Sequence, residues 1–231
     1  MSTAMKRAST GLKVAYVAVA AVDAVMAGSR SARVRGARTV TKPLLVPLLA
    51  ASLATDPRAA TSPLRTTTIA AQAGGWCGDV LLLEESPERF MAGAGSFALG
   101  HAAYIRGFRA HRSTTPVRGP AAVAALWAVT TPRLALGAAR KDPRLAPTVV
   151  AYNAVLSSMV ASTLGLAASV PQDARRASQA GAALFLVSDG LIGAGEFLLD
   201  DPPPRLETAV MLTYAAAQLL LAEGAARAGS H

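Results

Sequence analysis

The sequence has little cysteine, little charge and few aromatic residues. Cys77 is the single cysteine among 231 residues, so a disulfide framework within the chain is excluded. Only 16% of the residues are charged, against about 25% in a soluble domain. The three histidines are scattered and have no cysteine cluster beside them, which argues against a metal site. No glycine-rich phosphate loop and no metalloprotease helix motif occurs, so the sequence predicts no cofactor.

Apolar residues make up 52% of the chain, and Ala, Leu, Val and Gly dominate. They fall in eight runs, and polar segments rich in Arg and Lys separate these runs. A helix needs about 20 apolar residues to cross a bilayer core of about 30 Å, and shorter spans occur. We therefore expect an all-α polytopic membrane protein, a bundle of eight transmembrane helices. The runs cover residues 12–28, 41–54, 66–83, 90–106, 119–137, 147–169, 177–199 and 207–225.

The expected domain organisation is simple. Residues 1–11 form a polar basic N-terminal segment, residues 12–227 the eight-helix transmembrane domain, and residues 228–231 a C-terminal tail. A cleaved signal peptide is the rival interpretation of the first run, because basic, apolar and small-residue regions follow in order. Asp23 lies within that run and favours a retained helix.

The formal net charge of +9 raises the question of nucleic acid. The basic residues lie between apolar runs, as loop charges of a membrane protein do, and such loops suit anionic lipid headgroups. We therefore expect membrane lipids as partners and no nucleic acid. Lys and Arg are divided almost equally between the two sides of the expected bundle, so they select no orientation, and the sequence indicates no oligomeric state.

Asp189 lies inside the apolar run 181–193, about 15 Å from the nearer end of the expected helix. An ionisable group at that depth in a membrane is costly and is by default a candidate functional residue. The alternative for Asp189 is a soluble core helix with one paired Asp. Asp23 either faces the bundle interior and pairs with a base, or lies close enough to the helix end to reach water.

Several other polar residues converge with Asp189 when the eight helices alternate in direction. Lys42, Asp79, Asn153, Asp189 and Glu196 then lie toward one membrane surface, which predicts a polar pocket that opens there. Lys42 has an alternative role in which its side chain reaches the headgroups.

Three aromatic or imidazole side chains are weaker candidates. His101 falls near the midplane and Tyr104 nearer the opposite surface, on a helical face with Phe90 and Phe97. Such a stripe is more typical of packing than of chemistry. Tyr152 lies beside Asn153 in the sixth run.

Five sequence blocks carry a family resemblance. They are TKPLLVPLL (41–49), GDVLL (78–82), FALGHAAY (97–104), YNAVLSSM (152–159) and GAALFLVSD (181–189). In order and spacing they resemble the YhhN family, the bacterial branch of the lysoplasmalogenase membrane proteins. Each block alone is weak evidence, whereas the five together are fairly specific. They span about two thirds of the chain. The resemblance implies a multi-pass protein of the bacterial inner membrane with eight helices.

The resemblance also implies an activity, hydrolysis of the vinyl-ether bond of a lysoplasmalogen to a fatty aldehyde and a glycerophospho-alcohol. Asp79 and Asp189 fall on the acidic positions of the GD and SD blocks, and Lys42 and His101 on the KP and GH positions. Vinyl-ether hydrolysis needs a carboxylic acid to protonate the alkene and a carboxylate to stabilise the cation and activate water. Burial and a second carboxylate nearby both favour the protonated acid.

These considerations predict Asp79 and Asp189 as catalytic residues, with Asp189 as the acid or the reverse. A lysophospholipid is the expected substrate, and the candidate substrate-binding residues are Lys42, His101, Tyr104, Tyr152, Asn153 and Glu196. Two other classes remain open. A proton-coupled membrane transporter uses intramembrane acids in the same way, although we find no internal repeat. In a structural membrane protein the acids would only pair helices.

Overall fold

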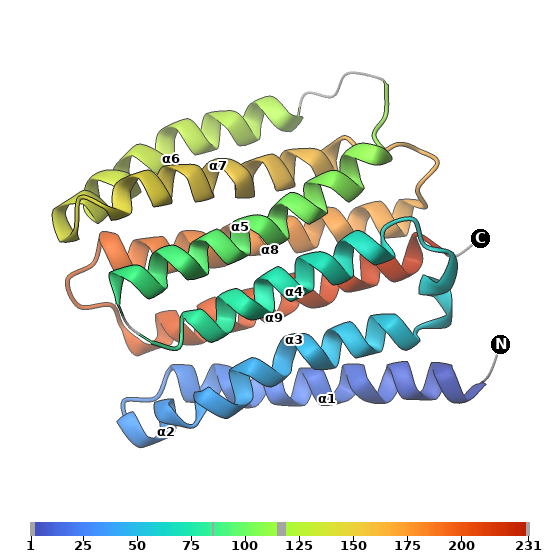
Figure 1. Cartoon of the computed structure of the whole chain (residues 1–231), viewed down its shortest axis with the longest axis horizontal. Coiled ribbons are helices and arrows are strands. Elements are labelled where there is room, and N and C mark those ends of the chain that lie inside the picture. Colours follow the sequence, from blue (N-terminus) through green and yellow to red (C-terminus); the bar gives the residue numbers. More distant parts are fainter. Residues whose placement is uncertain (1–2, 85, 115–118, 230–231) are drawn as a thin grey trace.

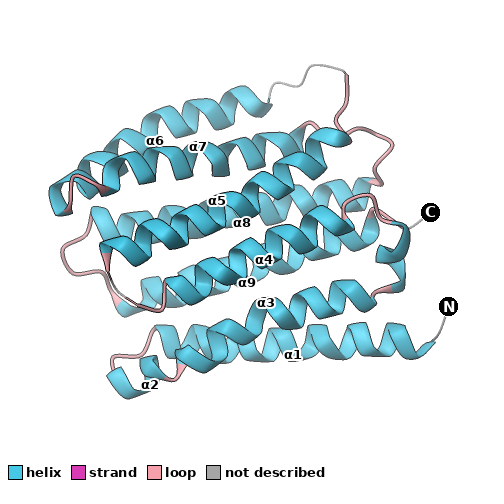
Figure 2. Cartoon of the chain, in the orientation of Figure 1, coloured by secondary structure: helices cyan, strands magenta, loops and turns pink. Residues whose placement is uncertain are grey.

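Helices account for most of the residues that the computed structural model describes, 3–84, 86–114 and 119–229, and these residues form no β-strand (Figure 2). The expected all-α class is therefore confirmed. The elements are α1 (Thr3–Ala27), α2 (Ala32–Gly36), α3 (Arg38–Thr55), the 3-10 helix η1 (Pro57–Thr61), α4 (Arg65–Leu81), α5 (Pro87–Ala110), α6 (Gly119–Lys141), α7 (Leu145–Leu164), α8 (Gln172–Phe197) and α9 (Pro204–Arg227).

The long helices lie side by side along one axis, with both chain ends at the same end of the bundle (Figure 1). Neighbours in the chain form antiparallel pairs: α1 packs on α3, α4 on α5, α6 on α7, and α8 on α9. The α9 helix lies centrally, since it contacts α1, α3, α4 and α8. In contrast, α6 lies at the edge of the bundle and packs mainly on α7.

Each of the eight apolar runs forms one long helix, but the ends differ: most helices begin before their run, and α1, α4, α7 and α8 end before their run does. The α1 helix already begins at Thr3, and α3 begins at Arg38 rather than at residue 41. The segments 29–41 and 55–65, which were expected to be loops, contain α2 and η1. The physical reason is that backbone hydrogen bonds continue through polar residues, whereas hydropathy marks only the apolar part of a helix.

Five of these helices, α1, α6, α7, α8 and α9, are long and apolar enough to cross a membrane. Among the described residues, α3, α4 and α5 do not meet the same measure of length and composition. Those three carry Lys42, Asp79 and His101, and α4 has only 17 residues. Each of the three helices that fall short thus brings a polar or charged side chain into the bundle interior.

The two prolines of α3 explain one contact between helices. Pro43 and Pro47 both lie inside α3. Pro47 has no N–H to donate to the carbonyl of Pro43 four residues earlier. The indole Nε1 of Trp76 on α4 donates to that carbonyl oxygen instead, at 3.0 Å. This hydrogen bond links α4 to α3 close to Lys42.

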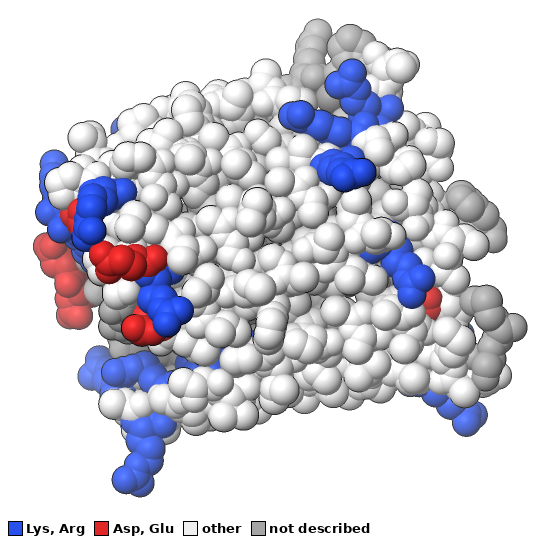
Figure 3. Space-filling view, viewed as in Figure 1, with Lys and Arg blue, Asp and Glu red and all other residues white. Residues whose placement is uncertain are grey.

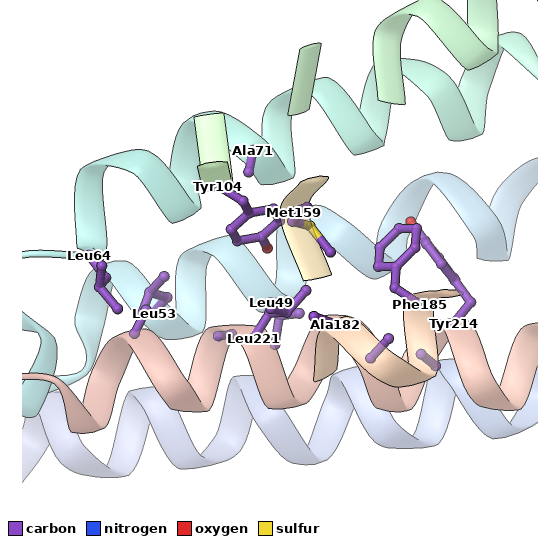
Figure 4. Packing of buried hydrophobic residues seen from close by; sticks show 14 of the residues in the cluster. Leu49, Leu53, Leu64, Ala71, Tyr104, Met159, Ala182, Phe185, Tyr214 and Leu221 are labelled. Atoms are coloured by element: carbon purple, nitrogen blue, oxygen red, sulfur yellow. The ribbon is translucent and has the colours of Figure 1, made fainter. Parts of the chain in front are cut away.

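Glycines let α4 and α5 approach closely. A Cβ added to Gly74 would lie 2.9 Å from the Cα of Gly100, so the two backbones meet with no side chain between them. Buried Leu, Met and aromatic side chains fill the rest of the bundle centre, where Phe185 and Tyr214 lie beside one another (Figure 4). This packing fixes the helices that carry the polar residues.

Charged side chains gather toward the two ends of the bundle, and the middle of the face in Figure 3 carries few. At the end that holds the termini, Asp56 accepts ion pairs from Lys13 at 2.9 Å and from Arg58 at 2.8 Å. Burial by itself would raise the pKa of the Asp56 carboxyl, but hydrogen bonds from Arg58 and Lys13 hold this pKa well below its usual range. Lys13 and Arg58 also pair with Glu223, which joins α1 and η1 to α9.

Candidate active site

A cavity opens among the helices at the end of the bundle opposite the termini. It contains about 820 Å³ of empty space, a volume that includes its open mouth. Its walls are mostly apolar, and Phe90, Phe97, Leu134 and Met211 contribute to them. The polar lining residues are Lys42, Asp79, Thr148, Tyr152, Asn153, Asp189 and Tyr214. They come from α3, α4, α7, α8 and α9, so the cavity collects residues from across the bundle.

Asp79 is buried near the end of α4, and side chains from two other helices, α3 and α9, surround its carboxylate. The Lys42 ammonium of α3 lies 3.6 Å from Oδ1 of Asp79. The Tyr214 hydroxyl of α9 donates to Oδ2 at 2.5 Å, and Gln218 donates its Nε2 hydrogen to the Tyr214 oxygen at 3.1 Å. A buried carboxylate requires a counter-charge or hydrogen bonds, and Asp79 has both.

Asp189 is half-buried in α8 and has neutral partners. The hydroxyl of Tyr152 on α7 donates to Oδ2 of Asp189. Nε2 of His101 lies 3.2 Å from the oxygen of the same hydroxyl. Because the hydroxyl has one hydrogen and donates it to Asp189, the His101 contact requires the hydrogen to be on Nε2. No lysine or arginine among the described residues forms an ion pair with Asp189.

Rings pack against the inner wall of the cavity and fix these polar groups. The Phe185 ring meets the His101 ring at 4.8 Å and the Tyr214 ring at 5.5 Å, both edge to face. Phe97 lies 6.2 Å from Tyr214 by ring centroids, and its ring occupies the space that a side chain at Gly78 would need. This aromatic packing holds the two hydrogen-bonded chains, Gln218–Tyr214–Asp79 and His101–Tyr152–Asp189, in place.

The structure brings most of the candidate residues together. Lys42, Asp79, Tyr152, Asn153 and Asp189 all line the cavity. His101 reaches it through the hydroxyl of Tyr152.

Two candidates lie elsewhere. Glu196, expected to share the face of Asp189, is exposed at the end of α8 and pairs with Lys141 at 3.6 Å. The next residue, Phe197, lines the cavity, so α8 still borders the cavity at this point but the Glu196 side chain faces away from it. Tyr104 is buried and stacks on Phe108 at 5.8 Å, with no hydrogen-bond partner for its hydroxyl among the described residues.

Tyr214 and Gln218 were not among the candidate site residues, although they complete the surroundings of Asp79. The sequence contained one usable signal. The two lie one helical turn apart in an otherwise apolar run, so both face the same side of α9. Gly75 marks the meeting point on α4, because a Cβ there would lie 3.3 Å from Nε2 of Gln218.

Metal ligation finds no support in the described residues, where no three His, Cys, Asp or Glu side chains come together. Cys77 is exposed and contributes nothing to the cavity. The chemistry that the side chains themselves can supply is proton transfer between carboxyl groups and a bound molecule, together with stabilisation of charge by Lys42 and the carboxylates.

The fold and the cavity define the class of protein. It is an all-α protein of apolar helices, typical of membranes, with two carboxyl groups in one internal cavity. The chain belongs to the YhhN family, whose model matches residues 37–225. The match begins beside α3 and ends in α9, so it includes every helix that lines the cavity. No curated protein and no solved structure matches the chain.

Proposed function

We propose that this protein is a lysoplasmalogenase-like hydrolase that spans the bacterial inner membrane with eight helices. Membership of the YhhN family supports the reaction class. The observation that carries the proposal is the unequal pair of carboxyl groups in one cavity. Asp79 has a cationic partner in Lys42, whereas the partners of Asp189 are neutral. Vinyl-ether hydrolysis needs such a pair, one carboxyl group to give a proton and one to carry negative charge.

In the first step Asp189 donates its proton to the alkene carbon that is not bonded to oxygen. The C=C electrons form the new C–H bond, and the ether oxygen shares its lone pair with the adjacent carbon, which gives an oxocarbenium ion. Tyr152 donates to Oδ2 of Asp189, so Oδ1 is the oxygen that carries the proton in this scheme. The negative charge of Asp79 stabilises the cation.

In the second step a water molecule attacks the oxocarbenium carbon and gives its proton to Asp79. The product is a hemiacetal. Its hydroxyl proton passes to Asp189 while its C–O bond to glycerol breaks, and the departing oxygen takes the proton from Asp79. The net reaction consumes one water and yields one fatty aldehyde and one glycerophospho-alcohol, and both carboxyl groups return to their initial protonation states.

The remaining polar groups have supporting roles in the proposal. Lys42 is partly exposed at the cavity and lies 3.6 Å from Asp79, so its ammonium both keeps Asp79 ionised and attracts the lipid phosphate. Asn153 lines the cavity beside Tyr152 and contacts the polar head of the substrate. His101 and Gln218 act through the tyrosine hydroxyls as positioning residues. Tyr104 and Glu196 have no assigned role, since neither lines the cavity.

The test is release of fatty aldehyde from a lysoplasmalogen by the purified protein in liposomes. We expect Asp79→Asn and Asp189→Asn each to lower kcat by about 10³-fold or more, in the upper range for acid–base groups. Asp23→Asn is the control, because Asp23 is buried as Asp79 is but pairs with Arg38 and Thr41 outside the cavity. Full activity in either cavity variant would remove that residue from the mechanism.

The proton-coupled carrier remains the second candidate, because each cavity carboxyl ends a chain of hydrogen-bonded groups that can pass a proton. Proton or solute flux in the same liposomes, with no aldehyde released, would favour it and contradict the hydrolase.

A further inference from the structure

A second hollow adjoins the cavity on the outer side of the bundle. It lies between α6 and α8 over α7, and we call it the α6–α8 groove. It encloses about 970 Å³ of empty space, open solvent included. The residues that the argument uses are Leu126, Thr130 and Leu134 of α6, Ser157 of α7, and Leu186 and Gly190 of α8.

The groove and the cavity share a wall. Leu134 and Asn153 line both of them. A Cβ at Gly193, which lines the cavity, would lie 3.1 Å from Cδ2 of Leu134, so the Leu134 side chain fills the seam between α6 and α8. Gly190 faces the groove directly after Asp189 in the chain, while Asp189 faces the cavity. One side chain therefore separates the candidate proton donor from the outer face of the bundle.

The groove presents a mostly apolar surface to its surroundings. Its charged lining residue is Arg133, whose guanidinium donates to the carbonyl of Val129 on the same helix at 2.6 Å. Its lining includes no acidic residue among those that the structure describes. Thr130 and Asn153 bond to carbonyls of their own helices, at 2.9 Å each. Leu126 and Val187 are about half exposed, at 48% and 50%, although both are large and apolar. In a membrane protein such a surface faces hydrocarbon.

The α6 helix is loosely held where it borders the groove. Its buried residues, Thr131, Leu134, Gly137 and Ala138, all lie in its second half. Pro132 within the helix removes one backbone hydrogen bond and allows a bend at that point. The first half of α6, which borders the groove from Leu126 to Thr130, is thus the less buried half of the helix.

We propose that the α6–α8 groove binds the hydrocarbon chain of the lysolipid while the vinyl-ether bond and the headgroup occupy the cavity. The proposal deepens the proposed function and rests on it. Continuity with the cavity carries the assignment, because the two spaces share Leu134 and Asn153 and a chain that starts beside Asp189 reaches the groove past Leu134. From Leu134 to Leu126 the groove extends eight residues along α6, which is about 12 Å along the helix away from the cavity. The chain enters sideways from the membrane.

Gly190 offers a variant that fills the groove without disturbing the packing. A Cβ at Gly190 meets no described atom within 4 Å, and the same holds for Gly95 on α5, which lines neither space. Gly190→Phe therefore places a ring in the groove, and Gly95→Phe places the same ring on another outward face. The two variants carry the same loss of glycine and the same added apolar surface.

The probe is a saturated ether lysophospholipid, which the enzyme cannot hydrolyse, with a photoreactive diazirine at the end of a long chain. After irradiation in liposomes, we expect adducts on peptides of α6 and α8 that contain Leu126 and Leu186. Gly190→Phe should lower this labelling at least fivefold, and Gly95→Phe should leave it unchanged. Labelling spread around all outward helices, or equal labelling in the two variants, would show annular lipid only and overturn the proposal.

Activity provides the second measurement. With long-chain and short-chain lysoplasmalogens, Gly190→Phe should lower the ratio of long-chain to short-chain kcat/KM at least tenfold, mainly through KM, and Gly95→Phe should not. An unchanged ratio would overturn the groove assignment. The photolabelling needs no turnover. Labelling confined to the groove with no aldehyde release would contradict the hydrolase while leaving the groove as a lipid site.

Discussion

Asp79 and Asp189 have similar hydrogen-bond partners but differ in burial and in charged partners. Each carboxyl accepts a hydrogen bond from a tyrosine, and each tyrosine has a further partner, Gln218 for one and His101 for the other. Only Asp79 also has a lysine beside it, at 3.6 Å. The comparison shows how one cavity can hold two carboxyl groups in two protonation states: the matched hydrogen bonds fix position, and the single cation sets the difference.

Removing that cation should have the largest effect among the variants outside the carboxyl groups. We expect Lys42→Met to lower kcat/KM by about 10²- to 10³-fold, because Asp79 then loses the charge that keeps it ionised. Lys42→Arg should recover part of the activity. The measurement is aldehyde release in liposomes. Lys141→Met is the control, since Lys141 pairs with exposed Glu196 outside the cavity, and equal activity in the two Met variants would remove Lys42 from the mechanism.

Removing each tyrosine hydroxyl tests which of the two carboxyl groups is charged. A hydrogen bond to a charged group contributes about 1.5–3 kcal/mol and one between neutral groups about 0.5–1.5 kcal/mol. Tyr214→Phe should therefore lower the free energy of unfolding more than Tyr152→Phe does. Reversible unfolding in mixed micelles measures both.

Tyr104→Phe is the control for these two variants, because its buried hydroxyl has no partner among the described residues. It should be neutral. A larger loss for Tyr152→Phe than for Tyr214→Phe would place the charge on Asp189 and contradict the assignment.

Disturbing the α4–α5 contact should affect both carboxyl groups together. Gly74→Ala places a methyl group 2.9 Å from the Cα of Gly100, which should push α4 from α5 and lower stability by about 1–3 kcal/mol. Asp79 lies on α4. His101, which contacts Asp189 through the Tyr152 hydroxyl, lies on α5. Gly95→Ala, where the added Cβ meets open space, should change stability little. Thermal unfolding of the two variants measures the difference, and similar melting would show that the helices do not pack as closely as described.

Asp56 serves as a reference for the cavity carboxyl groups, because it is a carboxylate with cationic partners at the other end of the bundle. Its folded-state pKa is lowered, so its ion pairs stabilise the protein fully above the unfolded pKa of about 3.9 and lose this contribution as pH falls toward the folded pKa. We expect stability to decline below about pH 4 in the wild type and less steeply in Asp56→Asn. Unfolding between pH 2 and pH 6 tests this, and equal slopes would mean that the pairs contribute nothing.

Sequence patterns predicted the existence of the long helices better than their ends. Each apolar run is long enough to specify one helix, but α2 and the start of α3 lie in a basic segment where hydropathy gives no signal. The eight spanning segments stay a prediction for α3, α4 and α5. Those helices face protein on several sides, so they need not be apolar throughout.

The part of the site that could be predicted consists of charged residues inside apolar runs. Asp79, Asp189 and Lys42 are conspicuous because charge is costly inside apolar runs. Tyr214 is not, since a tyrosine in such a run usually packs, and its contact with Asp79 depends on how α9 is rotated against α4. Glu196 shows the converse: a spacing of seven residues placed it on the face of Asp189, but its side chain is exposed while its neighbour Phe197 lines the cavity.

The central claim, that Asp189 holds a proton while Asp79 is ionised, can be tested by infrared spectroscopy of the protein in membranes at neutral pH. The account predicts a C=O stretching band of a protonated carboxyl group that disappears in Asp189→Asn and persists in Asp79→Asn. A band that disappears in Asp79→Asn and persists in Asp189→Asn would contradict it.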